Sequence, residues 1–309
     1  MRVLAIGECM AELVPAQSDG DYTLGFAGDT FNTAWYLAKL APDAEVAYFT
    51  ALGTDAISQN MRGFIADSGI DVTHVQAMPD LTVGMYLITL DAGERSFCYW
   101  RGQSAARHLA RDAEALRAAV AAADLIYFSG ITLAILPAPD RATLLAALAD
   151  ARAAGKPTVF DPNLRPRLWA DSAEMTATIM DGAAVSDIAL PSFEDEADWF
   201  GDQDPAATVD RYAGVGVKTV VVKNGAGPVR FRSAEGEAER PVEPVAAIVD
   251  TTAAGDSFNA GFLAGILTDV PMSDCVARAC ALARVVVQKK GALVPIDVAK
   301  LRSGDGGSA

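Results

Sequence analysis

Short β-branched segments alternate with longer Ala-rich helical patterns, and this alternation constrains the fold more than any other feature of the chain. Buried strands are predicted at 3–6, 46–49, 125–129, 158–161, 188–190 and 219–223. Helices are predicted between them, including 31–40, 56–67 and 141–154. A β-α-β-α order predicts a mostly parallel central sheet with helices on both faces, which is a three-layer α/β/α domain. Ligands of such sheets bind at the carboxyl ends of the strands.

Two regions break this alternation because they contain strand patterns with no helix between them. They lie within about 10–27 and 80–103, and the second has a polar turn at 91–94 that is typical of a hairpin. One interpretation is an extension of the main sheet at its edge. The other is a small separate sheet that covers the site as a lid and excludes water from it. We therefore expect one domain over 1–302, and a flexible end over 303–309.

Composition excludes several classes of protein. A formal net charge of −15 argues against a nucleic-acid partner, which would require a basic surface. It also makes Arg and Lys residues inside motifs informative, because they are the cations available to bind an anionic substrate.

Four cysteines without a C-x-x-C pair indicate a reducing compartment in a chain of 309 residues. No long uncharged apolar segment and no signal peptide are evident. We expect a cytoplasmic protein with no membrane partner.

Residues 250–262 combine small residues, a carboxylate and the start of an amphipathic helix. Ala253, Ala254 and Gly255 would let an anion approach their backbone N–H groups at the positive end of the helix dipole. Asp256 would then lie beside the anion and accept a proton from an attacking hydroxyl group. The alternative is an ordinary helix N-terminus with an Asp cap.

The full pattern D-T-T-x-A-G-D-S-F-x-A-G-F at 250–262 resembles the C-terminal signature of the ribokinase-like (PfkB) family of sugar kinases. The resemblance implies a ribokinase-like fold with a β lid, ATP and Mg²⁺ as cofactors, and Asp256 as catalytic base. The backbone amides of Ala253–Gly255 would form the anion hole and contact the nucleotide phosphates. By family likeness alone, a monovalent cation such as K⁺ would bind near Asp250 and Thr252.

A second segment, 28–34, begins the first crossover helix and resembles the N-terminal sugar-binding segment of the family. Gly28 would allow close approach of the sugar, while Asp29 and Asn32 would bind its hydroxyl groups. A Gly turn with a helix cap is the alternative interpretation.

The predicted hairpin carries Tyr86 on one strand, and Tyr99 and Arg101 on the other. Strand alternation places Tyr99 and Arg101 on the same face. One interpretation is that this face packs against the protein, with an extended Arg side chain. The other is that it belongs to a lid that closes over an anionic sugar.

The loop at 161–169 follows a buried strand and contains Asn163 and Arg165. Its arginines could simply pair with surface acids. The loop also resembles the Asp-x-Asn-x-Arg segment of 2-keto-3-deoxygluconate kinases, a subgroup of the family. That resemblance assigns Asn163 to ATP, and Arg165 to the substrate carboxylate or the transferring phosphate.

Two further loops complete the predicted nucleotide site. The family's Asn-x-x-Glu magnesium motif is represented here by Ser192 with either Asp195 or Glu196, although acidic residues are also common in the first turn of a helix. The nucleotide loop is represented by Lys223, Gly225 and Gly227, with the second Gly one place early.

These resemblances imply an ATP-dependent kinase for a sugar acid of the 2-keto-3-deoxygluconate type. A kinase for a neutral sugar on the same fold is the nearest alternative, and a catalytically silent sugar-binding regulator is another. The strand edges of the lid could pair between subunits and form a homo-oligomer.

Overall fold

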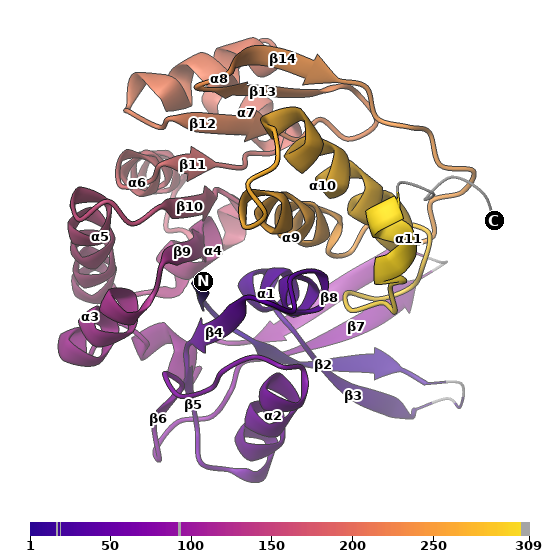
Figure 1. The fold of residues 1–309 in the computed structure, drawn as a ribbon. Helices are drawn as coiled ribbons and strands as arrows, with labels where there is room; N and C mark the ends of the chain where they lie inside the picture. The colour runs from indigo at the N-terminus through magenta and orange to yellow at the C-terminus, as the bar shows by residue number, and fades with distance from the viewer. Residues whose placement is uncertain (17, 19, 92–93, 304–309) are drawn as a thin grey trace.

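The computed structural model describes residues 1–16, 18, 20–91 and 94–303 (Figure 1). Of the predicted flexible end, 304–309 lie outside the described residues. Ser303 is the last residue of helix α11 (Val298–Ser303).

The central sheet has the strand order β14-β13-β12-β11-β10-β9-β1-β4. Its strands are β1 (Arg2–Ile6), β4 (Glu45–Phe49), β9 (Leu125–Ser129), β10 (Thr158–Asp161), β11 (Ile188–Ala189), β12 (Thr219–Val222), β13 (Val229–Ser233) and β14 (Gly236–Arg240). Neighbours from β4 to β12 pair in parallel, whereas β13 and β14 are antiparallel. The predicted parallel sheet is thus confirmed, and its antiparallel edge was not anticipated.

Alternate residues of the buried strands point to opposite faces of the sheet. Val3 and Ala5 belong to one core cluster, and Leu4 and Ile6 to the other. Helices α1 (Asp29–Leu40), α2 (Ala56–Asp67), α9 (Ala254–Ile266) and α10 (Met272–Val286) contribute to the first cluster. Helices α3 (Ala113–Ala122), α4 (Gly130–Ile135), α5 (Ala138–Ala153), α6 (Ser172–Ala184) and α8 (Pro205–Gly214) contribute to the second. This burial on both faces explains why the strands are almost continuously apolar.

The C-terminal half of helix α9 lies against α10 at very short range. A Cβ atom on Gly261 would lie 2.8 Å from Cα of Ala279, and one on Gly265 would lie 2.8 Å from Cα of Cys275. The two glycines therefore allow the helix backbones to pack directly against each other.

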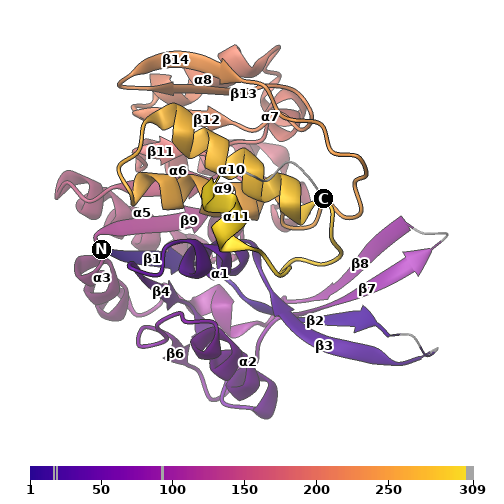
Figure 2. The ribbon, with the colours of Figure 1, turned by 45° about the vertical axis from the view of Figure 1, so that its right-hand side comes forward.

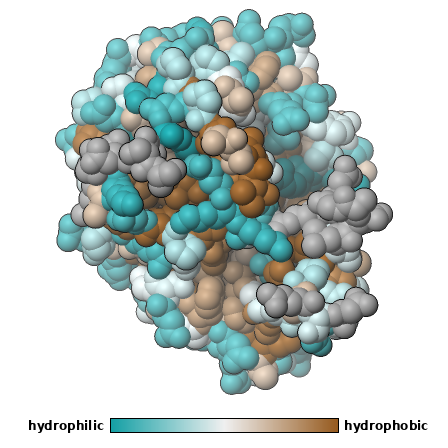
Figure 3. Space-filling view, turned by 90° about the vertical axis from the view of Figure 1, so that its right-hand side faces the viewer, coloured by the Kyte–Doolittle hydropathy of each residue, from teal (hydrophilic) through white to brown (hydrophobic). Residues whose placement is uncertain are grey.

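A separate four-stranded sheet extends from the body, as Figure 2 shows. Its order is β3-β2-β7-β8, with strands β2 (Met10–Pro15), β3 (Tyr22–Ala27), β7 (Met85–Asp91) and β8 (Glu94–Trp100). Met10, Tyr86 and Ile88 form its own small core. The separate sheet is therefore confirmed, and the alternative of an edge extension is wrong; we refer to this sheet as the lid. Figure 3 shows the side of the molecule that faces right in Figure 1, where hydrophobic and hydrophilic residues are interspersed.

The remaining elements are short. They are α7 (Phe193–Phe200), the 3₁₀ helices η1 (Ala105–His108) and η2 (Pro166–Leu168), and a two-stranded sheet of β5 (Ala51–Leu52) and β6 (Gln76–Ala77). Among the residues that the structure describes, no helix is both long and apolar enough to span a membrane.

Candidate active site

Asp256 lies in the first turn of α9, and its side chain is buried at the contact with α1. The Asn32 amide donates a hydrogen bond of 2.7 Å to Asp256 Oδ2, and the Thr33 hydroxyl donates one of 3.1 Å to the Asp256 carbonyl. The residue is 9% exposed. Two residues of α1 therefore hold Asp256 in place, Asn32 through the carboxylate and Thr33 through the backbone carbonyl.

The backbone before Asp256 forms a tight turn. Ala253, at the N-cap of α9, has a φ of 59°, a left-handed conformation that is unfavourable for a residue with a Cβ atom. The N–H group of Ala254 donates to the Thr251 carbonyl at 3.1 Å, whereas those of Ala253 and Gly255 have no acceptor among the described residues. An anion hole in this conformation would therefore use Ala253 and Gly255, which departs from the prediction that Ala254 also donates.

Burial raises the pKa of Asp256 to about 8. The negative charges of Asp29 and Asp161 also raise this pKa, while the Asn32 hydrogen bond and the Lys223 charge lower it. A carboxyl group of this kind exchanges its proton near neutral pH, as a general base must.

Lys223, in the predicted nucleotide loop, lies close to residues of β10 and α9. Its Nζ atom lies 3.1 Å from Asp161 Oδ1 and 3.3 Å from Asn259 Oδ1. The Asn259 amide in turn donates to Asp161 Oδ2 at 2.7 Å. A Cβ atom on Gly255 would lie 3.6 Å from Lys223 Nζ, so the ammonium group lies beside the turn that precedes Asp256.

Three residues of this site were not predicted from the sequence, namely Asp161, Asn259 and Thr33. Asp161 could have been found, because it ends a buried strand at its carboxyl end. Asn259 gave no such signal, since it lies within a helix whose neighbouring positions are apolar.

The predicted sugar-binding residues of α1 are engaged with the protein. Asn32 holds Asp256 through its amide, and its Oδ1 accepts from the Gly28 N–H group at 3.3 Å. A Cβ atom on Gly28 would lie 2.1 Å from the Glu8 carbonyl oxygen. Close packing against the backbone of residues 8–9 is thus enough to explain a Gly at position 28. Its predicted role, to allow close approach of the sugar, stays a prediction.

Asp29 and Asn163 meet although they come from distant segments. The Asn163 amide donates to Asp29 Oδ2 at 3.1 Å. Burial raises the pKa of Asp29, and the nearby Asp161 charge adds to this effect. Asn163 and Arg165 have φ values of 34° and 48°, so this loop has two residues in the left-handed region. Asn163, predicted to contact ATP, is here beside a predicted sugar ligand.

The lid residues have different degrees of exposure. Tyr86 pairs with Tyr99 across the hairpin, and their ring centroids are 5.7 Å apart. Tyr86 is buried and donates to Glu12 Oε2 at 2.5 Å, while Tyr99 is 52% exposed. Arg101 forms an ion pair with Glu8, another residue that the sequence analysis did not single out.

The two magnesium candidates face different surroundings. Glu196 is fully buried and accepts from Arg211 at 2.7 Å and from Tyr212 at 3.0 Å. Burial raises its pKa to about 7. Both of its oxygens are used within α7 and α8, which disfavours it as a metal ligand. Asp195 lies near the charges of Arg165, Asp161 and Lys223, and burial raises its pKa.

Within the described residues, no three His, Cys, Asp or Glu side chains come together as a metal-binding group. An ion held mainly by nucleotide phosphates and water, with one carboxylate, fits this arrangement.

The remaining predicted residues lie in loops around the same sheet edge. Ser192 and Lys223 are neighbours in a parallel bridge, and Gly225 has a φ of 54°. A Cβ atom on Gly227 would lie 2.5 Å from Asn224 Nδ2, so a larger residue at this position would displace the Asn224 side chain. Asp250 accepts from the Thr252 hydroxyl at 2.7 Å and from the Gly291 N–H group at 2.7 Å. This hydrogen bond connects the loop that contains Gly291 to the 250–262 segment.

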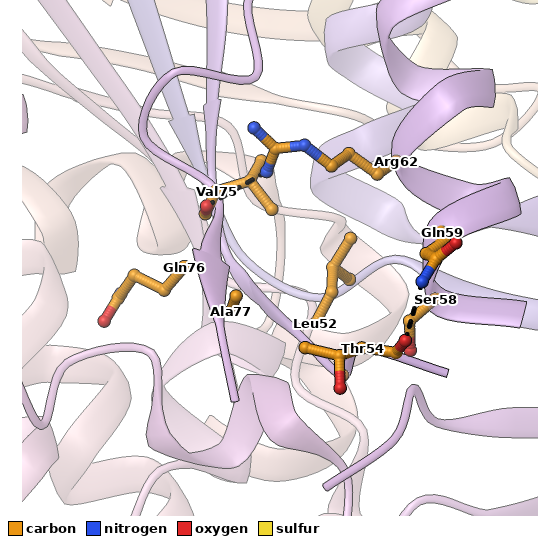
Figure 4. A pocket seen from close by; sticks show the side chains of 9 residues that line it. Leu52, Thr54, Ser58, Gln59, Arg62, Val75, Gln76 and Ala77 are labelled. Atoms are coloured by element: carbon orange, nitrogen blue, oxygen red, sulfur yellow. Dashed lines mark hydrogen bonds between the residues drawn. The ribbon is translucent and has the colours of Figure 1, made fainter. Parts of the chain in front are cut away.

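A cavity of about 320 Å³ lies elsewhere, between α2 and the two short strands β5 and β6 (Figure 4). Arg62 donates to the Val75 carbonyl, and Gln59 donates to the Thr54 carbonyl. The polar side chains of its wall thus bond within the protein, and none of its lining residues belongs to the predicted site.

A family model for pfkB family carbohydrate kinases matches residues 1–299. The chain belongs to this family. The match covers both the body and the lid, and it includes the 250–262 segment that carried the resemblance in the sequence.

Curated relatives and solved structures extend this result. The 2-dehydro-3-deoxygluconokinase of Dickeya dadantii is 40% identical over 96% of this chain and 97% of its own length. The 2-dehydro-3-deoxygluconokinase of Escherichia coli K12 is 39% identical over 95% of this chain and 97% of its own length. A PfkB protein from Polaromonas sp. JS666 superposes with a TM-score of 0.85 at 28% identity over 97% of this chain and 99% of its own.

A further structure is the aminoimidazole riboside kinase of Salmonella enterica complexed with aminoimidazole riboside and an ATP analog. It has a TM-score of 0.82 at 25% identity, covering 98% of this chain and 99% of its own. The ribokinase-like fold predicted from the sequence is confirmed by these neighbours.

Proposed function

We propose that this protein transfers the γ-phosphoryl group of ATP to 2-keto-3-deoxygluconate and produces the 6-phosphate. The observation that carries the proposal is the position of Asp256, a buried carboxylate with a raised pKa at the N-terminus of α9. Two relatives about 40% identical over nearly their whole length bear the name of this activity. ATP as donor is supported by the related kinase solved with an ATP analog.

In the proposed reaction, Asp256 accepts the proton of the primary hydroxyl group as its oxygen attacks the γ-phosphorus. The N–H groups of Ala253 and Gly255, at the positive end of α9, stabilise the charge that develops on the phosphoryl oxygens. Lys223 adds a positive charge beside the same turn, and Asp161 and Asn259 hold it there. Asn32 keeps the Asp256 carboxylate oriented.

Mg²⁺, when bound with the nucleotide, would neutralise phosphate charge. Asp195 is the residue that we assign to it, through water. Gly225, Gly227 and Ser192 would shape the nucleotide loop. A monovalent cation beside Asp250 and Thr252 stays a prediction, which a comparison of rates in K⁺ and in a bulky organic cation would check.

The preference for an acid rests on Arg165. This residue is exposed and forms no ion pair within 4.0 Å among the described residues, whereas the charge of Arg101 is compensated by Glu8. A guanidinium group without a direct ion-pair partner is suited to a carboxylate. We therefore assign Arg165 to the carboxylate, and Asp29, Tyr86, Tyr99 and Arg101 to the remaining oxygens of the sugar acid.

The test is an ADP-release assay across 2-keto-3-deoxygluconate, its galactonate-derived epimer, fructose and ribose. The proposal predicts the highest kcat/KM for one of the two keto-deoxy acids. A higher value for fructose or ribose would establish the neutral-sugar alternative. Absence of ATP consumption with every sugar, with retained sugar binding, would establish the silent regulator.

Association through the lid is a separate proposal. Leu24 at one edge of the lid, and Phe97 and Trp100 at the other, are exposed hydrophobic residues on strands with free edges. Sedimentation velocity of the protein and of a Trp100→Lys variant would test it.

We also propose a reducing, cytoplasmic compartment, with which the four free cysteines are consistent.

A further inference from the structure

Three chain segments that enter or leave the lid meet at the side chain of Glu8. Glu8 lies between β1 and β2, Gly84 directly precedes β7, and Arg101 directly follows β8. A Cβ atom on Gly84 would lie 2.7 Å from Glu8 Oε1 and 3.1 Å from Cβ of Arg101. Because Gly84 has no side chain, Glu8 and Arg101 can make contact in the space beside it.

Glu8 is buried, with 2% of its surface exposed, and both of its carboxylate oxygens accept hydrogen bonds. Arg101 Nη2 donates to Oε2, and the Ser104 hydroxyl donates to Oε1 at 2.5 Å. Backbone bonds tie the same region together, since the Ala11 N–H group donates to the Gly84 carbonyl and that of Ala105 to the Thr82 carbonyl. A buried ion pair at such a junction fixes geometry more than it adds stability.

Arg101 also has an unused donor. Its side chain is 11% exposed, yet its Nε atom is buried and has no hydrogen-bond partner among the described residues. A buried donor without an acceptor is unfavourable unless a ligand or water supplies one. The Arg101 charge is close enough to lower the pKa of Asp29, so the guanidinium group lies on the sugar side of the site.

We propose that Glu8 is a positioning residue, which acts through Arg101 to fix the segments that join the lid to the body. It also directs the accessible part of the Arg101 guanidinium group at an uncharged oxygen of the sugar acid. The assignment of Arg101 to the sugar rests on the proposed function. Because Glu8 compensates the charge of Arg101, the pair recognises a hydroxyl or keto oxygen, and the carboxylate is left to Arg165.

The test compares Glu8→Gln with Asp187→Asn as the matched control. Asp187 is also a buried carboxylate that binds an arginine, Arg152 at 3.2 Å, but it lies at the start of β11, where no lid segment is attached. We expect Glu8→Gln to raise the KM for the sugar about tenfold, because the variant loses one charge-assisted hydrogen bond. The KM for ATP should stay unchanged. Amide hydrogen exchange should become faster in β7 and β8. Asp187→Asn should change neither KM selectively.

A double-mutant cycle decides whether Glu8 acts through Arg101. In an Arg101→Met background, Glu8→Gln should cause no further rise in the KM for the sugar. Full additivity, an unchanged KM for the sugar in Glu8→Gln, or an equal rise of both KM values would each overturn the proposal. If Glu8→Gln does not fold, Ser104→Ala removes one Glu8 partner, and a rise of about twofold in the KM for the sugar alone is expected.

The sugar used is the one that the substrate panel identifies. Failure of 2-keto-3-deoxygluconate as a substrate would therefore refute the proposed function without deciding the role of Glu8. An active wild-type kinase with an unaffected Glu8→Gln variant would refute the role of Glu8 alone.

Discussion

Asp256 and Tyr99 are both predicted to contact the substrate, but they belong to regions that are built differently. Asp256 is 9% exposed and is held by α1, while Tyr99 is 52% exposed on a lid strand. The proposed phosphate side of the site is formed by helices and strands of the main core, and its polar groups are bonded to one another. The lid has a small core of its own, and the segments that join it to the body meet at Glu8.

This difference indicates a division of roles. In the proposed reaction, groups of the body act in the chemical step, so their loss should reduce kcat. Groups of the lid should affect sugar binding, since their positions depend on how the lid lies. The predictions below test this division.

The largest expected effect is that of Asp256→Asn. We expect kcat to fall by about 10³-fold or more, because the amide cannot accept the proton, while the KM for the sugar stays similar. Steady-state kinetics and circular dichroism would check this. Wild-type kcat in the correctly folded variant would exclude Asp256 as the base.

Lys223→Met should have the next largest effect. Without the ammonium group beside the α9 turn, we expect kcat to fall by about 10²-fold and the KM for ATP to rise. Lys223→Arg is the control that keeps the charge and should retain more activity. A change confined to the KM for the sugar would contradict the placement of Lys223 on the phosphate side.

The pH dependence tests the electrostatics of the body. Because burial raises the pKa of Asp256 to about 8, kcat/KM for the sugar should increase with pH up to that value. It should fall about tenfold per pH unit below it. A profile that stays flat down to pH of about 5 would contradict a raised pKa.

The same pKa predicts an effect on stability. Between the ordinary pKa of 3.8 and about 8, the folded protein binds the Asp256 proton more tightly than the unfolded chain does. The contribution of this carboxyl group to stability therefore decreases as pH rises through that window. Asp256→Asn removes the effect, so its melting temperature relative to wild type should increase with pH.

The smallest effect is expected in the lid, for Tyr99→Phe. Removal of this exposed hydroxyl group should raise the KM for the sugar no more than about threefold and leave kcat unchanged. Initial-rate measurements over a range of sugar concentrations would check this. A large fall in kcat would contradict the division between body and lid.

The parallel sheet could be predicted because its strands are buried on both faces and therefore have a strong apolar signal. Strands β13 and β14 were missed because charged residues such as Arg230 and Glu239 pair across them on an exposed edge. The lid was predicted as one of two alternatives, since local sequence does not determine which sheet a hairpin joins.

The 250–262 segment was found from its local order of residues. Its contacts with distant segments were not found. Asn32 was predicted to bind the sugar, whereas in the fold it bonds to Asp256, and the pair of Asp161 and Asn259 forms only through the packing of β10 against α9. Glu196 shows what local sequence leaves open: an acidic helix turn suggested a metal ligand, and in the fold its carboxylate binds Arg211.

The most direct test is a crystal structure with a non-hydrolysable ATP analogue and 2-keto-3-deoxygluconate bound together. Our account predicts the primary hydroxyl oxygen at about 2.6–3.2 Å from a carboxylate oxygen of Asp256, with the terminal phosphate at the N-terminus of α9. A sugar whose hydroxyl is directed to another residue, or a phosphate bound away from that helix, would contradict it.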